Sequence, residues 1–204
     1  MAKDSLQHND SSRRILLHMI PNRHFRGQPI SFIGVYPRNS TYGGETGFEI
    51  IVIFVVLKEL AMKVLITGTS QGIGKAVAEL FLEKGHEVVG IDRKASAIEH
   101  ENYIHYVCDV RDWESLPEID DVDILINNAG TQNEDDIDIN LKSLIRITEK
   151  YGIQKNIRSI LNIGSASGHT GAEFPEYCAS KGGVIAYTRN VAQRVAEFGA
   201  TCNS

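Results

Sequence analysis

The stretch that decides the fold is Met62-Lys63-Val64-Leu65-Ile66-Thr67-Gly68-Thr69-Ser70-Gln71-Gly72-Ile73-Gly74. Its first part, Lys63–Thr67, is a β-branched apolar run of the size of a buried parallel strand. A helix is predicted next, with apolar residues at helical spacing: Ile73, Val77, Leu80 and Phe81. Gly85 is the predicted C-terminal stop of this helix, and His86–Ile91 predicts a second strand. The stretch therefore indicates a strand, a glycine-rich turn, a helix and a second strand.

The glycines of this turn have physical roles in such a unit. Together Gly68, Gly72 and Gly74 allow a tight turn, let the backbone approach a pyrophosphate and let the helix pack close to the strand. Phosphates would then lie at the helix N-terminus, where free N–H groups and the helix dipole favour anions. A plain tight turn is the alternative, but the strand–turn–helix–strand context favours a dinucleotide site.

Asp92 lies eighteen residues beyond Gly74, at the carboxyl end of the second predicted strand. A carboxylate there can accept hydrogen bonds from the adenosine ribose hydroxyls and would repel a 2′-phosphate, which favours NAD over NADP. Arg93 favours NADP instead, because an arginine can bind a 2′-phosphate. Gln71 stands where a basic residue would also help NADP, so it favours NAD. We expect NAD, with NADP as the alternative.

The rest of the chain continues the alternation of strands and helices. Further strands are predicted at Tyr103–Val107, Val122–Ile126 and Ser159–Ile163, and helices at Ile137–Tyr151 and Glu176–Phe198. Such alternation predicts an α/β fold with a doubly wound parallel sheet, right-handed crossovers and helices on both faces.

Composition is that of an ordinary soluble globular protein. The chain has 204 residues, of which 42% are hydrophobic and 23% charged, with a formal net charge of -5. No basic block suggests nucleic acid, and we expect a cytoplasmic protein. The three cysteines, Cys108, Cys178 and Cys202, lack metal-ligand spacing, so we expect reduced thiols and no metal site.

Residues 1–61 read differently from the rest. They hold seven basic and five acidic residues, whereas residues 62–204 hold fourteen and twenty-one. Residues 1–47 show no sustained helical or strand period, and the apolar run 48–57 is too short to span a bilayer, which needs ~20 apolar residues. That run could be a buried strand or the start of a helix. We expect residues 1–61 to be a partly disordered extension, and residues 62–204 to be the folded nucleotide-binding domain.

Tyr177 and Lys181, in Tyr177-Cys178-Ala179-Ser180-Lys181, are four residues apart. On a helix this spacing places both side chains on one face. A cation beside a phenol favours the ionised form, so the pair can act as an acid/base device for a proton on oxygen. The spacing alone is common on helix surfaces, and its meaning depends on the rest of the chain.

From Met62 onward the chain resembles the classical short-chain dehydrogenases/reductases, which have a Rossmann-type sheet. The resemblance covers residues 62–204 and rests on four motifs in order: Thr67–Gly74, Asp109 with Val110, Asn127–Gly130, and Ser165 followed by Tyr177 and Lys181. It implies an NAD(P)-dependent oxidoreductase that interconverts an alcohol and a ketone by hydride transfer.

The resemblance also implies roles for individual residues. Tyr177 would be the catalytic acid/base, Lys181 would assist its ionisation and hold the nicotinamide ribose, and Ser165 would hydrogen-bond the substrate oxygen. Ser167 is the competing serine, Asn140 would hold a water of the proton relay, and Asn127 would stabilise the central sheet. The expected cofactor-binding set is Gly68, Ser70, Gln71, Gly72, Ile73, Gly74, Asp92, Asp109, Val110, Asn128, Ala129, Gly130, Tyr177 and Lys181, with Asp109 at the adenine edge and 128–130 along the adenosine ribose.

Two departures from the family pattern stand out. The segment between Gly130 and Asn140 is shorter than in the family. This weakens the expectation that Asn140 holds the relay water and that the protein forms the usual tetramer. The chain also ends at Ser204, where the sixth strand of the family is just forming, so the final strands and the substrate-binding floor would be missing. We interpret the chain as a fragment of a longer protein. The alternative is that a partner covers the open edge of the sheet.

Three functions follow as hypotheses. The first is an alcohol/ketone oxidoreductase with a small-molecule substrate, no nucleic-acid or membrane partner, and a homo-oligomeric state when intact. The second is a dinucleotide-binding module or inactive fragment without turnover. The third, a sugar-nucleotide epimerase or dehydratase, shares the Tyr177/Lys181 spacing but is disfavoured by Gly72-Ile73-Gly74 and Asn127–Gly130.

Overall fold

The computed structural model describes residues 35–42, 45–52 and 61–204, and the chain divides into two units, Met1–Leu60 and Ala61–Ser204. In the first unit, β1 (Val35–Tyr42) pairs antiparallel with β2 (Glu45–Val52), with Val35 opposite Val52. The sequence pattern does not predict β1. β2 includes residues 48–52 of the apolar run 48–57, and residues 53–57 lie outside the described residues. The disorder expected for the extension falls in part on residues 1–34, which also lie outside the described residues.

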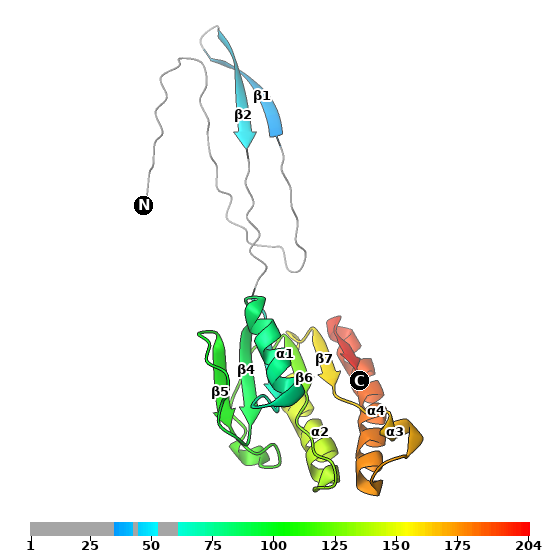
Figure 1. The fold of residues 1–204 in the computed structure, drawn as a ribbon. Helices are drawn as coiled ribbons and strands as arrows, with labels where there is room; N and C mark the ends of the chain where they lie inside the picture. The colour runs from blue at the N-terminus through cyan, green and yellow to red at the C-terminus, as the bar shows by residue number, and fades with distance from the viewer. Residues whose placement is uncertain (1–34, 43–44, 53–60) are drawn as a thin grey trace. The chain divides into compact units, whose positions relative to one another are not determined.

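The second unit is built on a six-stranded sheet whose paired strands are all parallel (Figure 1). The strand order is β5-β4-β3-β6-β7-β8, so the chain starts in the middle and builds outward first on one side and then on the other. The strands are β3 (Lys63–Thr67), β4 (Glu87–Asp92), β5 (Tyr103–Val107), β6 (Ile124–Asn127), β7 (Ser159–Asn162) and β8 (Thr201–Asn203). The predicted doubly wound α/β sheet is confirmed.

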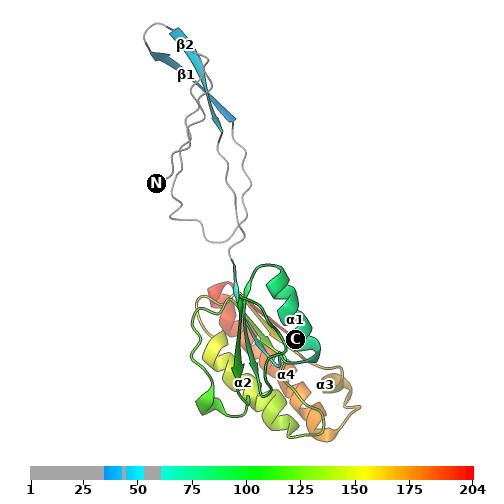
Figure 2. The ribbon, with the colours of Figure 1, turned by 60° about the vertical axis from the view of Figure 1, so that its left-hand side comes forward.

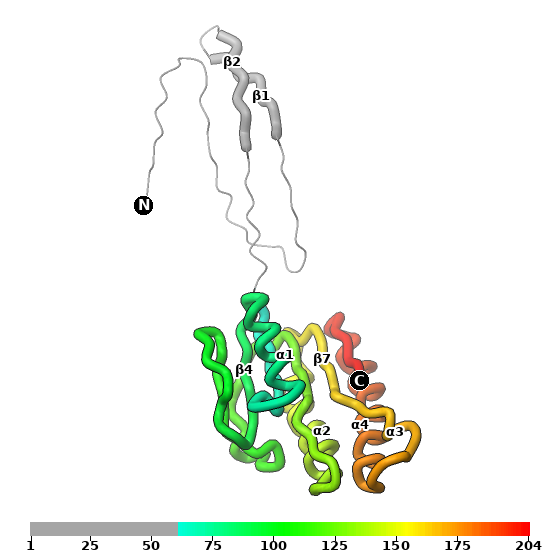
Figure 3. Tube along the Cα trace, in the orientation of Figure 1, coloured from blue at the N-terminus to red at the C-terminus, as the bar shows by residue number. Residues whose placement is uncertain are grey.

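Helices cover both faces of this sheet. Figures 1 and 2 show α1 on one face and α2 with α4 on the other. The helical elements are α1 (Gly72–Glu83), η1 (Trp113–Ser115), η2 (Ile137–Lys142), α2 (Ser143–Ile147), η3 (Thr148–Gly152), α3 (Ser167–Thr170), α4 (Pro175–Val195) and η4 (Ala196–Phe198). After η4 the chain returns to the sheet beside β7, as the trace in Figure 3 shows.

The alternating faces of β3 divide the core into two clusters. Leu65 packs with the residues under α4 and η3, including Tyr151 and Val191. Val64 and Ile66 point to the other face, toward Ala78 and Leu82 of α1. Because both faces of the strand are buried, its residues can be apolar throughout, which is why Lys63–Thr67 has a continuous apolar pattern.

The predicted apolar face of α1 is partly wrong. Ile73 is 63% exposed and Leu80 is 50% exposed, and the buried residues of this helix are Gly74, Ala78 and Leu82. A Cβ at residue 74 would overlap the Gly68 carbonyl oxygen. The need to place Gly74 against the turn rotates the helix, so the residues four and eight positions later face the sheet.

The predicted helix at Ile137–Tyr151 is one continuous helical segment, Ile137–Gly152, with a composite geometry. Its first and last turns, η2 and η3, are π-helical, and α2 between them is α-helical. π-Helical turns are rare and concentrate at functional sites. Asn140 lies in the first of them. Among the described residues, no helix is long and apolar enough to cross a membrane.

Candidate active site

The glycine-rich turn after β3 is locked to the loop after β6. Asn128 Nδ2 donates to the carbonyl oxygens of Thr67 (3.0 Å) and Gly68 (3.2 Å). In return, Thr67 Oγ1 accepts the backbone N–H groups of Asn128 and Ala129, each at 3.0 Å. Gly68 has a φ of +78°, and a Cβ there would lie 2.7 Å from Asn128 Nδ2. A side chain at residue 68 would therefore be both strained and obstructed.

The N-terminus of α1 provides donors for an anion. Gln71, the residue before the helix, makes no capping hydrogen bond with its side chain, so the N–H groups of the first turn are not capped by it. Gly74 brings this turn against the Gly68 carbonyl without a side chain between them. This arrangement fits a pyrophosphate group that approaches the backbone closely.

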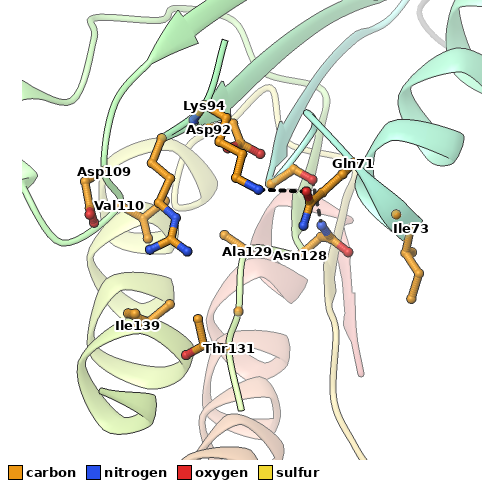
Figure 4. Close-up of a pocket in the computed structure, with 14 residues that line it drawn as sticks. Gln71, Ile73, Asp92, Lys94, Asp109, Val110, Asn128, Ala129, Thr131 and Ile139 are labelled. Atoms are coloured by element: carbon orange, nitrogen blue, oxygen red, sulfur yellow. Dashed lines mark hydrogen bonds between the residues drawn. The ribbon is translucent and has the colours of Figure 1, made fainter. Parts of the chain in front are cut away.

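Asp92, at the end of β4, is held by two backbone donors. Its Oδ2 accepts the Ser70 N–H at 2.9 Å, and its Oδ1 accepts the Lys94 N–H at 2.9 Å. Lys94 Nζ donates to Gln71 Oε1 at 2.8 Å, and Ser70 Oγ donates to the Lys94 carbonyl. The carboxylate is thus fixed in direction beside the turn. The hydrogen bond from Lys94 to Gln71 also joins the segment after β4 to this turn (Figure 4).

Asp109 is paired with Arg111, an arginine that belongs to none of the sequence motifs. Arg111 donates to Asp109 from its backbone N (2.9 Å), Nε (3.0 Å) and Nη2 (2.7 Å). Hydrogen bonding from Arg111 lowers the pKa of Asp109, against the opposing effect of burial. Arg111 also bonds Asp135 at 2.9 Å, so it links the segment after β5 to the segment after β6.

A cavity of about 280 Å³ lies between these segments (Figure 4). It brings together most of the expected cofactor residues: Gly68, Gln71, Gly72, Ile73, Asp92, Asp109, Val110, Asn128, Ala129 and Gly130. Four further residues complete its lining: Arg93, Lys94, Thr131 and Ile139. Ser70, Gly74, Tyr177 and Lys181, also expected at the cofactor, do not line this cavity.

Tyr177 and Lys181 lie in the first turns of α4, as predicted. Lys181 is buried, and its Nζ lies 5.8 Å from the centroid of the Tyr177 ring. The ammonium donates to the Ile163 carbonyl at 2.7 Å, which fixes it at the end of β7. Burial lowers the pKa of Lys181, and the negative charge of Asp136 acts in the opposite direction. The phenol and the ammonium are therefore placed on one helix face at close range.

The two serines after β7 differ in their surroundings. Ser165 is half-buried, and its Oγ accepts the N–H of Ser167 at 3.1 Å. Ser167 is buried and begins α3. Gly168 of the same short helix packs on the α4 backbone, since a Cβ there would lie 2.7 Å from the carbonyl carbon of Lys181. Ser165, the more accessible of the two, is the better placed to meet a ligand.

Asn140 is buried, and its side chain is fully engaged. Oδ1 accepts the Thr131 N–H at 2.8 Å, while Nδ2 donates to the Thr131 carbonyl (2.9 Å) and to Ser180 Oγ (3.2 Å). Ser180 Oγ in turn donates to the Tyr177 carbonyl at 2.8 Å. The side chain thus joins the loop after β6 to the helix that carries Tyr177. Thr131 and Ser180 are absent from the sequence-based site, because no motif spacing relates them to Asn140, which is 9 residues from Thr131 and 40 from Ser180.

Asn127, the first residue of the same motif, points into the sheet. Its Nδ2 donates to Thr148 Oγ1 (2.9 Å) and to Asn162 Oδ1 (2.8 Å), and Asn162 donates to Thr188 Oγ1 (2.9 Å). This buried polar chain connects β6 and β7 with η3 and α4. Its position agrees with a role in the sheet and is separate from the cavity.

Metal and thiol chemistry receive no support from the described part of the chain. Within it, no three His, Cys, Asp or Glu side chains gather as a metal site would require. Cys108 and Cys202 are buried, Cys178 is half-buried, and all three are free. Burial raises the pKa of Cys202 to about 11, which makes it a poor nucleophile.

Comparisons with known proteins match residues 62–204 to a described family. The sequence profile described as short chain dehydrogenase matches residues 62–204. The 3-oxoacyl-(acyl-carrier-protein) reductase FabG of Vibrio harveyi is 35% identical over 170 residues, covering 69% of this chain and 70% of that protein. Human 15-hydroxyprostaglandin dehydrogenase (NAD+) is 34% identical over 160 residues, covering 63% of this chain and 59% of that protein.

A solved structure shows the same fold. A short chain dehydrogenase from Leptospira borgpetersenii with bound NAD+ superposes with a TM-score of 0.64 at 23% identity, and the match covers 74% of each chain. At that identity the likeness concerns the fold alone. The chain thus combines a sequence match to one family with this sheet order, the glycine-rich turn and the Tyr177/Lys181 pair.

Proposed function

The chain belongs to the short-chain dehydrogenase family of NAD(P)-dependent oxidoreductases, and from that premise we propose that it interconverts an alcohol and a ketone with NAD. The observation that carries the proposal is the Lys181 ammonium, buried and 5.8 Å from the centroid of the Tyr177 ring on helix α4. Two of the relatives, an oxoacyl reductase and a hydroxyprostaglandin dehydrogenase, support chemistry between a carbonyl and a hydroxyl.

Tyr177 is the proposed acid/base of this reaction. In the oxidative direction its phenolate accepts the proton of the substrate hydroxyl, and in reduction the phenol returns a proton to the oxygen. The Lys181 charge favours the phenolate, and Ser165 Oγ donates to the substrate oxygen as negative charge develops on it. Bound NAD would supply the hydride acceptor, at its nicotinamide ring.

We propose NAD as the preferred cofactor. Asp92 is fixed by the N–H groups of Ser70 and Lys94 at the edge of the cavity, where its charge opposes a 2′-phosphate. Arg93 and Lys94 also line the cavity and act in the opposite sense. Lys94 keeps its charge but directs its Nζ to Gln71 Oε1, whereas the Asp92 carboxylate is fixed by two backbone donors, so we take Asp92 as the stronger determinant.

The proposal is tested with the full chain and a single tyrosine variant. NADH fluorescence titration measures cofactor affinity, and a panel of secondary alcohols with NAD measures turnover. Tyr177→Phe should lower turnover by about 10²–10⁴-fold, the usual contribution of a positioned acid or base, while the NADH Kd stays within about twofold. Tyr106→Phe, at a partly exposed tyrosine of edge strand β5, is the matched control and should behave as wild type. Wild-type turnover in Tyr177→Phe would refute the acid/base assignment.

A second candidate function is dinucleotide binding without turnover. It is favoured by the cavity itself, which lies along the glycine-rich turn and is not lined by Ser165, Tyr177 or Lys181. The two candidates separate in the same experiment. Saturable NADH binding with no turnover of any alcohol or ketone would support the binding module and defeat the enzyme.

A further inference from the structure

A chain of hydrogen bonds beside the cofactor cavity is not used by the proposed reaction. It starts at His105 of β5, whose Nε2 lies 2.9 Å from the Lys94 carbonyl oxygen. A carbonyl oxygen only accepts, so Nε2 carries a proton and donates it. Lys94 lines the cavity, whereas His105 does not. The imidazole therefore contacts the wall of the cavity from outside.

The other ring nitrogen of His105 connects to the glycine-rich turn. Nδ1 lies 2.9 Å from the Tyr103 hydroxyl, and this hydroxyl donates to Thr69 Oγ1 at 2.8 Å. Thr69 belongs to the turn and is fully buried. Tyr103 and His105 are two residues apart on one strand, so their side chains lie on the same face of β5. One strand thus contacts both the glycine-rich turn and the segment after β4.

Gly90 of β4 provides the space for this chain of hydrogen bonds. It lies opposite His105 in the register of the two strands. A Cβ at residue 90 would overlap both the Tyr103 hydroxyl and Thr69 Oγ1. A glycine inside a strand often marks such a close approach. Any larger residue at this position would separate the phenol from the turn, so the sequence of β4 is matched to the hydrogen bond between Tyr103 and Thr69.

The Lys94 backbone is the point at which these connections meet the cofactor site. Its carbonyl accepts from Ser70 Oγ at 3.1 Å as well as from His105, which uses both lone pairs of the oxygen. Its N–H donates to Asp92 Oδ1, and Asp92 Oδ2 accepts the Ser70 N–H. The direction of the Asp92 carboxylate therefore depends on where the Lys94 backbone is held, and His105 holds it from outside the cavity.

We propose that His105 is a positioning residue of the cofactor site, which holds the Lys94 backbone so that Asp92 faces the adenosine ribose. The assignment rests on the proposed function, in which the cavity binds NAD. His105 acts through Lys94, and Tyr103 joins it to the glycine-rich turn. Loss of the contact should leave the fold intact, because β5 is an edge strand and His105 is partly exposed.

The direct test compares His105→Asn with His105→Gln in cofactor-free protein. A glutamine amide reaches the position of the imidazole Nε2 and can donate to the Lys94 carbonyl, whereas the shorter asparagine amide stays near the position of Nδ1. NMR measures hydrogen exchange at the Ser70 and Lys94 N–H groups, which both donate to Asp92. Exchange should be at least about fivefold faster than wild type in His105→Asn and within about twofold of wild type in His105→Gln.

The second readout is the NADH Kd, measured by fluorescence titration. It should rise at least about fivefold in His105→Asn, as for the loss of one hydrogen bond, and stay within about twofold of wild type in His105→Gln. His100→Ala is the matched control. This exposed histidine accepts the Asn102 N–H just before β5, and its loss should change neither the exchange rates nor the Kd.

Equal exchange rates in the asparagine and glutamine variants would overturn the proposal. Faster exchange in His105→Asn with a wild-type NADH Kd would also overturn it, because His105 would then stabilise the segment without positioning the cofactor site.

If His105→Asn does not fold, Tyr103→Phe takes its place, because it removes only the hydroxyl that joins His105 to Thr69. Exchange at the Ser70 N–H should then be at least about threefold faster than in wild type, and an unchanged rate would refute the proposal. A wild-type chain that binds no NADH would defeat the proposed function, and the exchange rates would still decide whether His105 positions Asp92.

Discussion

Asn140 and Ser180 are joined by a buried hydrogen bond of 3.2 Å, from Nδ2 of the one to Oγ of the other. The bond links a π-helical turn after Gly130 to the helix that carries Tyr177 and Lys181. Asn140 also holds both backbone groups of Thr131. A single side chain therefore joins the loop after β6 to α4, the helix that carries Tyr177 and Lys181.

Truncation of Asn140 should destabilise the protein and displace the loop. Asn140→Ala leaves the Thr131 N–H and carbonyl, which are partly buried, without their partners, at a cost of at most about 1–3 kcal/mol each. We expect the free energy of unfolding, measured with urea, to fall by about 2–4 kcal/mol. Asn190→Ala, at an exposed position of α4, should change it by less than about 0.5 kcal/mol. Equal effects of the two variants would contradict the linking role.

Gly74→Ala tests the close contact between α1 and the turn. The new Cβ would overlap the Gly68 carbonyl oxygen, so the helix must move away from the strand. Overpacking of this kind costs about 1–3 kcal/mol, and we expect NADH binding to weaken by at least tenfold because the first-turn N–H groups shift with the helix. In Gly164→Ala the nearest atoms lie at 3.7 Å or more, so this control should unfold as wild type. Tight NADH binding by Gly74→Ala would exclude this turn as the phosphate site.

Strand β3 could be predicted from the sequence because it is buried on both faces and apolar throughout. The edge strand β5 is largely exposed, and it could be predicted because its aromatic and β-branched residues favour strands. Lys63–Thr67 and Tyr103–Val107 match β3 and β5 residue for residue. The β1 strand escaped prediction because its sequence is mostly polar, although Gly43-Gly44 separates it from β2 and is a known hairpin signal. The α1 face was mispredicted because hydrophobicity alone does not register that Gly74 must face the turn.

The site could be predicted only where a motif carries it. Gly68, Asp92 and Asn128 follow from fixed positions at strand ends, and all three line the cavity. Thr131 and Ser180 could not be found in this way, since their importance arises where Asn140 of η2 forms hydrogen bonds with both of them. Arg111 is a similar case: its pairing with Asp135 spans 24 residues and depends on the arrangement of two loops.

Asp92→Ser tests the cofactor preference. Serine removes the negative charge beside the proposed ribose site and leaves Arg93 and Lys94 to act on a 2′-phosphate. We expect the ratio of the NADPH Kd to the NADH Kd to fall by at least about tenfold, which corresponds to about 1.4 kcal/mol. Asp112→Ser, at an exposed acid after β5, should leave the ratio unchanged. If both variants keep the wild-type ratio, Asp92 does not select the cofactor.

The Arg194–Glu149 pair predicts a pH-dependent contribution to stability. Arg194 donates twice to Glu149, at 2.6 and 2.7 Å, and this hydrogen bonding lowers the pKa of Glu149 below its ordinary value of 4.5. A carboxyl with a lowered folded-state pKa stabilises the fold above the unfolded-state value, and this stabilisation is lost as pH falls through the folded-state value. Both side chains are more than a third exposed, so the contribution stays below about 1 kcal/mol. Arg194→Gln should therefore lower the free energy of unfolding in urea at pH 7, and the difference from wild type should shrink as pH falls below 4.5 and as salt is added. The control is Arg189→Gln, at an exposed position of the same helix, which should show neither trend. A pH-independent effect of Arg194→Gln would mean that Arg194 stabilises the fold by packing and not by charge.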